Sequence, residues 1–181
     1  NKQTDVLITD FSKAFDKVSH ARLLQNLHYY GVRGHNNRWI SNFLNDRKQR
    51  VVLDESQSNV VEVDSGVPQG SVLGPCLFLY YINDLTDKMT STVRLFADDA
   101  IMYLAIQSQQ DTAKLQHDLD VLGNWASDWK MELNTEKCHV ITVTRKRSHL
   151  QHDYTLNGTI LDSVKSSKYL GITITQDLKW D

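Results

Sequence analysis

The sequence predicts an α+β fold whose sheet is mainly antiparallel. Helical and strand-like patterns are mixed along the 181 residues without strict β-α-β alternation. Strand-like runs also recur in pairs joined by short links, which is typical of hairpins and therefore of antiparallel pairing. The hydrophobic content of 40% and charged content of 23% are those of a globular protein, and they exclude a disordered tail or a coiled coil.

The individual elements follow from apolar spacing and from the residues that begin and end them. Ser19 is a potential helix N-cap and Gly31 a helix stop, while Asn157-Gly158 is a strong hairpin-turn signal. Helices are expected at residues 19–31, 39–44, 77–85 and 115–129. Strands are expected at residues 4–10, 49–53, 60–63, 92–96, 101–104 and 140–143, a hairpin at residues 154–164, and a further β-rich run at residues 169–174.

Three carboxylates lie at the ends of predicted strands. Asp10 ends the first strand, and Asp98 and Asp99 occupy the link between two paired strands. A sheet would bring them to one rim, where uncompensated carboxylates repel one another and cost several kcal/mol to desolvate. Mg²⁺ relieves that repulsion, and two such ions can activate a hydroxyl and neutralise a leaving pyrophosphate. The alternative is that Asp98-Asp99 is ordinary turn chemistry and Asp10 a solvated strand end.

A second candidate site is the segment from Gly66 to Gly70. Glycine permits close backbone approach, Pro68 stiffens the chain, and Gln69 offers both a hydrogen-bond donor and an acceptor. Such a loop suits contact with a nucleotide or a template base. The alternative is a tight turn that precedes a helix.

Five motifs in order resemble the reverse transcriptase domain, most closely that of non-LTR (LINE-like, jockey-type) retrotransposons. The resemblance covers essentially the whole chain. The motifs are Asp10 with Lys13-Ala14-Phe15-Asp16, Gly66–Pro75 (GVPQGSVLGP), Phe96-Ala97-Asp98-Asp99, Trp125 and Trp129 with Leu133-Asn134 and Lys137-Cys138, and Lys168-Tyr169-Leu170-Gly171.

The resemblance implies a polymerase palm over residues 1–181, with part of the fingers at about residues 20–65 and the thumb largely absent. The chain is then expected to be a fragment of a larger polyprotein. The implied function is RNA-directed DNA polymerisation for retrotransposition, with an RNA template, a DNA primer and a deoxynucleoside triphosphate. The implied cofactors are two Mg²⁺ ions, for which Mn²⁺ can substitute.

The resemblance also assigns roles to individual residues. Asp10, Asp98 and Asp99 would be the catalytic residues and metal ligands. Phe15 would lie under the sugar of the incoming nucleotide and exclude a ribose hydroxyl, whereas its apolar character alone suits a core aromatic. Asp16 would be structural. The remaining nucleotide or template contacts would be Phe11, Pro68, Gln69, Gly70 and Lys137, and the primer grip Leu170 and Gly171.

Other polymerases on the same palm are alternatives, namely a group II intron enzyme or an RNA-templated RNA polymerase, although Phe15 argues against the latter. A different alternative is a catalytically incompetent or domesticated copy that binds nucleic acid or protein. The net charge of −2 does not by itself indicate a nucleic-acid binder.

No apolar run reaches the ~18 residues of a membrane span, and no targeting signal is readable. We therefore expect an intracellular protein of the cytoplasm or nucleus, without a membrane partner. Cys76 and Cys138 are expected to be reduced, mostly buried thiols. The sequence does not indicate an oligomeric state.

Overall fold

The computed structural model describes residues 2–179. They form two compact units. The sheet unit runs to Ser12 and resumes at Asp84, and the helical unit comprises Lys13–Asn83. None of the helices in the described part of the chain is long and apolar enough to cross a membrane.

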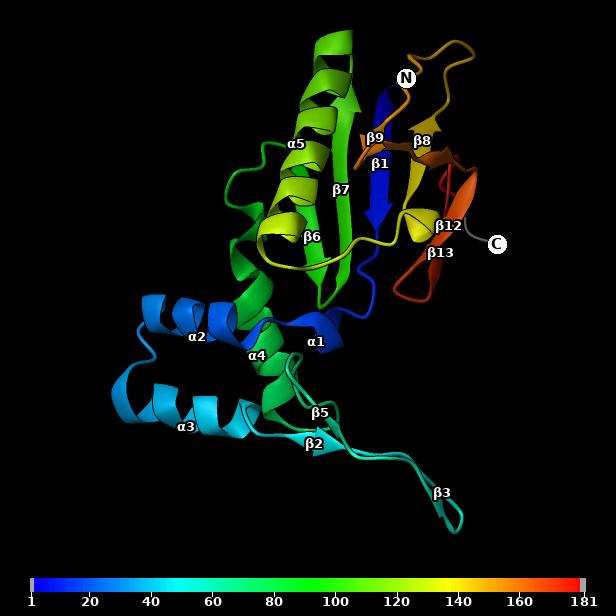
Figure 1. The fold of residues 1–181 in the computed structure, drawn as a ribbon. Helices are drawn as coiled ribbons and strands as arrows, with labels where there is room; N and C mark the ends of the chain where they lie inside the picture. Colours follow the sequence, from blue (N-terminus) through cyan, green and yellow to red (C-terminus); the bar gives the residue numbers. More distant parts are fainter. Residues whose placement is uncertain (1, 180–181) are drawn as a thin grey trace. The chain divides into compact units, whose positions relative to one another are not determined.

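The sheet unit contains a five-stranded sheet in the order β11–β8–β1–β7–β6 (Figure 1). Central β1 pairs antiparallel with β7 and β8, β6 pairs antiparallel with β7, and β11 joins the edge of β8 in parallel. The predicted α+β fold with a mainly antiparallel sheet is therefore confirmed. The strands are β1 (Gln3–Thr9), β6 (Thr92–Phe96), β7 (Asp99–Ile106), β8 (His139–Thr144) and β11 (Asp162–Ser163).

β1 is buried on both of its faces, as expected of a central strand, and the face of Leu7 also carries the buried polar residues Gln3, Asp5 and Thr9. Val6 and Ile8 point to one face, where they pack with Ile101 and Ile141. Leu7 points to the other face and is fully buried. Two small hairpins complete the unit, β9 (Thr155–Leu156) with β10 (Thr159–Ile160) and β12 (Ser166–Tyr169) with β13 (Ile172–Thr175).

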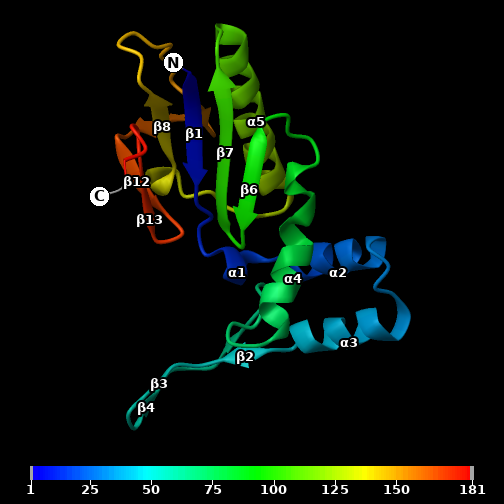
Figure 2. The ribbon, with the colours of Figure 1, turned by 180° about the vertical axis from the view of Figure 1, so that it is seen from behind.

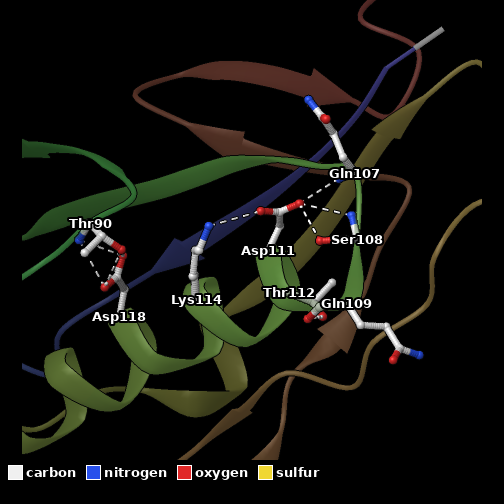
Figure 3. A network of polar contacts seen from close by, with 8 residues as sticks. All are labelled: Thr90, Gln107, Ser108, Gln109, Asp111, Thr112, Lys114 and Asp118. Atoms are coloured by element: carbon white, nitrogen blue, oxygen red, sulfur yellow. Dashed lines mark hydrogen bonds and ion pairs between the residues drawn. The ribbon is translucent and has the colours of Figure 1, made fainter.

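Helix α5 (Gln109–Asp128) packs against β7 and is held by two aspartates (Figure 3). Asp111 accepts hydrogen bonds from the backbone N–H groups of Gln107 and Ser108, and these bonds, with that of the Ser108 hydroxyl, lower the pKa of Asp111. Asp118 is fully buried and accepts from the backbone N–H groups of Thr90 (3.0 Å) and Ser91 (2.6 Å). Asp118 therefore joins α5 to the segment that precedes β6.

Replacement of Asp118 by Ala is expected to lower the free energy of unfolding by about 2–4 kcal/mol, because the backbone N–H groups of Thr90 and Ser91 lose their charged acceptor. Urea unfolding of the wild-type and variant chains measures the difference. The matched control is Asp120→Ala, which removes an exposed carboxylate from the same helix and should cost at most about 0.5 kcal/mol. Equal losses in the two variants would contradict the anchoring role of Asp118.

The helical unit contains α1 (Ala14–Lys17), α2 (His20–Tyr29), α3 (Gly34–Leu44) and α4 (Leu73–Ile82), and α2 packs against both α3 and α4 (Figure 2). Leu23 and Leu27 of α2 are buried, as are Phe78 and Tyr81 of α4. A long hairpin leaves the helices. It pairs β2 (Lys48–Gln49) with β5 (Val61–Glu62) and, nearer its tip, β3 (Val52–Leu53) with β4 (Ser56–Gln57).

Several local predictions are confirmed and others are wrong. The hairpin turn at Asn157-Gly158 is present, and both residues have positive φ. The β-rich run predicted at residues 169–174 is also present, as the end of β12, its turn and the start of β13, whereas α3 begins five residues earlier than the predicted residue 39. Cys138 is buried as expected, but Cys76 is exposed because α4 is apolar on both sides and only one side is covered.

Candidate functional site

The register of β1 against β7 brings Asp10 to the tip of the β6–β7 hairpin. Thr9 is paired with Ala100, so the next residue on each strand places Asp10 opposite Asp99. Directly opposed residues of an antiparallel pair have Cβ atoms about 4.5–5.5 Å apart. The Thr9 hydroxyl also donates to the Ala100 carbonyl at 3.2 Å, which holds this end of the pair closed.

Asp98 lies in the two-residue turn of that hairpin, because Phe96 is paired with Asp99 and only Ala97 and Asp98 connect them. Ala97 has φ of 53°, a left-handed conformation that is uncommon for a residue with a Cβ atom. The tight turn therefore keeps two consecutive carboxylates at the end of the sheet, next to Asp10.

The three carboxylates act on one another electrostatically. Burial raises the pKa of Asp99, and the negative charges of Asp98 and Asp10 raise it further. Lys137 opposes this effect, and its Nζ lies 3.4 Å from Oδ2 of Asp10. The site is therefore a cluster of negative charge. Among the groups that shift the pKa of Asp99, Lys137 is the one positive charge.

Lys137 reaches Asp10 because the chain before β8 runs along the chain after β1. The Ser12 N–H donates to the Glu132 carbonyl at 2.7 Å, and the Asn134 N–H donates to the Asp10 carbonyl at 2.9 Å. A short 3₁₀ turn, Thr135–Lys137, then places Lys137 beside the carboxylate. Its side chain remains 67% exposed, so the ammonium group is accessible to a ligand.

Tyr169 is a neighbour of the cluster that the sequence did not indicate. Burial raises the pKa of its phenol, and the charge of Asp99 raises it further. Tyr169 ends β12, and the turn that follows consists of Leu170 and Gly171, both with positive φ. Leu170 is exposed at this turn. Its positive φ is a conformation that Gly or Asn adopts more easily than Leu does.

Phe11 lies inside the sheet unit rather than on its surface. Its side chain is 3% exposed, and its ring makes an edge contact with Trp125. If Phe11 contacts a nucleotide, as predicted, the contact must therefore come from its backbone and not from its ring.

The other predicted nucleotide contacts belong to the helical unit. Phe15 is half-buried, with its ring stacked on Phe78 at 4.4 Å between centroids. Pro68 is half-buried, whereas Gln69 and Gly70 are exposed. Pro68 and Gln69 border a cavity of about 620 Å³, which Lys13 and Arg47 also line.

Among residues 2–179, no three acidic, histidine or cysteine side chains are grouped closely enough to hold one ion by themselves. Mg²⁺ does not require such a cage, since it commonly binds one or two carboxylates and completes its coordination with water and substrate phosphates. The oxygen donors and the mutual repulsion around Asp99 fit a hard divalent cation.

The family model for reverse transcriptase (RNA-dependent DNA polymerase) matches residues 1–174. The chain belongs to the reverse transcriptase family. The RNA-directed DNA polymerase from mobile element jockey of Drosophila melanogaster is 30% identical over 93% of the chain, and that of Drosophila funebris is 31% identical over 93%. The predicted resemblance to non-LTR retrotransposon enzymes is confirmed.

The chain spans about a fifth of the length of these two relatives, 19% of each. Apo telomerase from Candida tropicalis, truncated from its C-terminal domain, has a similar fold, with a TM-score of 0.68 and 14% identity. The match covers 100% of the chain and 36% of the telomerase chain. The predicted motif residues lie in both units. The acidic cluster, Lys137 and the Leu170-Gly171 turn belong to the sheet unit, and Phe15 and Pro68–Gly70 belong to the helical unit.

The charge arrangement makes a prediction for a metal-free reverse transcriptase. Replacement of Asp99 by Asn is expected to increase the free energy of unfolding at neutral pH, because it removes a carboxylate that burial and two like charges disfavour. The gain should be largest above the raised pKa of Asp99. It should shrink as the pH falls through that pKa towards the unfolded value of about 4, because wild-type Asp99 then becomes protonated.

Urea unfolding of both chains in EDTA across this pH range measures the gain. A difference that does not change with pH would contradict the electrostatic explanation. A loss of stability in Asp99→Asn at neutral pH would do so as well.

Proposed function

We propose that this chain carries the polymerising centre of an RNA-directed DNA polymerase that serves retrotransposition. The observation that supports this most strongly is the strand register, which places Asp10 opposite Asp99 and beside the Asp98 turn. Both named jockey relatives are RNA-directed DNA polymerases. The proposed substrates are an RNA template, a DNA primer and a deoxynucleoside triphosphate.

In this proposal Asp10 and Asp98 hold Mg²⁺, and Asp99 adds negative charge that favours cation binding. Bound Mg²⁺ would lower the pKa of the primer 3′-hydroxyl and neutralise charge that develops on the transferred phosphate. The hydroxyl would give up its proton to water as its oxygen bonds to the α-phosphorus, the bond from the α-phosphorus to the bridging oxygen would break, and pyrophosphate would leave. The chain's own contribution is to position these groups and to supply charge.

Lys137 has a second part in the proposal. Its ammonium is paired with Asp10 at 3.4 Å, yet the side chain is two-thirds exposed. When a cation binds Asp10, the attraction between Lys137 and that carboxylate weakens, and the ammonium becomes free to bind phosphate oxygens of the triphosphate. The lysine would then lie on the side of the leaving pyrophosphate.

Primer extension by the full-length protein tests the proposed function. An RNA template with a DNA primer is incubated with deoxynucleotides or ribonucleotides, and with Mg²⁺, Mn²⁺ or EDTA. We expect extension with deoxynucleotides in Mg²⁺, extension in Mn²⁺ as well, and none in EDTA. Binding of the primer–template without extension in any metal would overturn the proposal and favour a non-catalytic binding module.

A further inference from the structure

The Gly66–Gly70 segment, which contains Gln69, is attached to the chain around α1 by backbone hydrogen bonds. The Gly66 N–H donates to the Val18 carbonyl at 2.8 Å, and the Val67 N–H donates to the Phe15 carbonyl at 2.8 Å. The Ser65 hydroxyl donates to the Asp16 carbonyl, also at 2.8 Å. None of these bonds uses the Asp16 side chain.

Glycine at position 66 allows the two backbone segments to approach each other closely. A Cβ atom at Gly66 would lie 2.7 Å from the Asp16 carbonyl oxygen, and its φ of 82° also favours glycine. The Gly66 carbonyl accepts a hydrogen bond from Arg47 Nη2 at 2.9 Å and lies 2.8 Å from Nε2 of buried His20. The backbone that precedes Gln69 and the backbone of Asp16 are therefore both held in place.

The Asp16 carboxylate, which the backbone attachment leaves unused, binds the side chain of Gln69. Gln69 Nε2 donates to Asp16 Oδ1 at 2.8 Å, and both residues are exposed. An ionised carboxylate only accepts hydrogen bonds, so the amide must turn its nitrogen towards Asp16. The Gln69 Oε1 atom is thereby directed away from Asp16 and left available as an acceptor.

We infer that Asp16 is a positioning residue that sets the orientation of the Gln69 amide for nucleotide binding. The inference rests on the proposed function, and it gives Asp16 a role beyond the structural one predicted from the sequence. Because Asp16 holds the amide nitrogen, Gln69 would present its carbonyl oxygen, Oε1, to the incoming nucleotide. The group recognised there is accordingly a hydrogen-bond donor of the nucleotide, either a sugar hydroxyl or a base amino group.

A double-mutant cycle in the full-length protein tests the inference. The measured quantity is the Kd of a deoxynucleoside triphosphate on a primer–template whose primer ends in a dideoxynucleotide, so that no turnover is needed. Asp16→Ala is expected to raise the Kd about five- to tenfold, the effect of losing one charge-assisted hydrogen bond at an exposed site. In the Gln69→Ala background the same substitution should change the Kd less than about twofold.

Two further variants separate positioning from charge or folding. Glu55→Ala removes an exposed carboxylate from the turn between β3 and β4 of the same unit, one without a hydrogen bond or ion pair among residues 2–179, and should leave the Kd within about twofold. Asp16→Asn retains an acceptor oxygen for Gln69 and should restore the Kd to within about threefold of wild type. A melting temperature measured for each variant shows whether it is folded.

Equal effects of Asp16→Ala with and without Gln69 would overturn the inference, as would an equal effect of Glu55→Ala. Extension of an unterminated primer by the wild-type protein tests the proposed function separately. Coupled nucleotide binding without extension would leave Asp16 as a positioning residue while the polymerase proposal fails. Extension together with uncoupled binding would overturn the role of Asp16 alone, and absence of nucleotide binding would overturn both.

Discussion

Asp10→Asn and Asp98→Asn are each expected to reduce the rate of primer extension about a hundred- to a thousandfold. Each substitution keeps the size of the side chain but removes the negative charge that holds the cation. The cation's stabilisation of the developing charge is then lost, and a single electrostatic group at a reacting centre is typically worth about 10²–10³ in rate. The measurement is single-nucleotide extension by the full-length protein at saturating Mg²⁺.

Both variants should remain folded, because loss of either carboxylate relieves repulsion with Asp99, and the ion pair of Asp10 with the exposed Lys137 contributes little to stability. Asp162→Asn is a suitable control, since it neutralises an exposed carboxylate on β11 of the same sheet and should leave the rate unchanged. Wild-type rates in either Asp10→Asn or Asp98→Asn would refute the assignment of that residue as a metal ligand.

Phe15→Ala is expected to increase the use of ribonucleotides relative to deoxynucleotides about 10- to 100-fold. The reverse transcriptase resemblance implies that the ring of Phe15 would lie against the sugar, where an added 2′-hydroxyl would be overpacked at a cost of about 1–3 kcal/mol. The ring is held in one place by its stacking on Phe78. Competition between the two nucleotide types for a single incorporation measures the selectivity.

A control with the ring retained separates shape from stability. Phe15→Tyr keeps the ring and the stacking on Phe78, and we expect its selectivity to remain close to wild type. Phe15→Ala also removes a half-buried aromatic, so its stability should be measured in parallel. Unchanged sugar selectivity in a folded Phe15→Ala variant would count against the steric role.

The fold class and the ends of the central strands follow from local sequence. Asn157-Gly158 favours a tight turn, and the consecutive apolar residues Val6, Leu7 and Ile8 between polar residues are typical of a strand. Elements that depend on tertiary pairing were less predictable. β11 is two residues long and joins β8 in parallel, an arrangement that no local pattern announces.

The site shows the same division between residues that local patterns indicate and contacts that arise from tertiary packing. The acidic residues were found because they follow strand patterns and match family motifs. The pairs Lys137–Asp10 and Gln69–Asp16 join segments 127 and 53 residues apart, so periodicity and spacing contain no information on them. The proximity of Tyr169 to Asp99 likewise arises from packing of the β12–β13 hairpin against the sheet.

The most direct test of the central proposal is the position of a bound cation. Crystals of the protein soaked in Mn²⁺, which prefers the same hard oxygen ligands, would locate the ion by its anomalous scattering. We predict a peak bound by one oxygen each of Asp10 and Asp98, with these two oxygens at most about 4.2 Å apart. A peak that involves neither residue, or no peak at saturating Mn²⁺, would contradict the account.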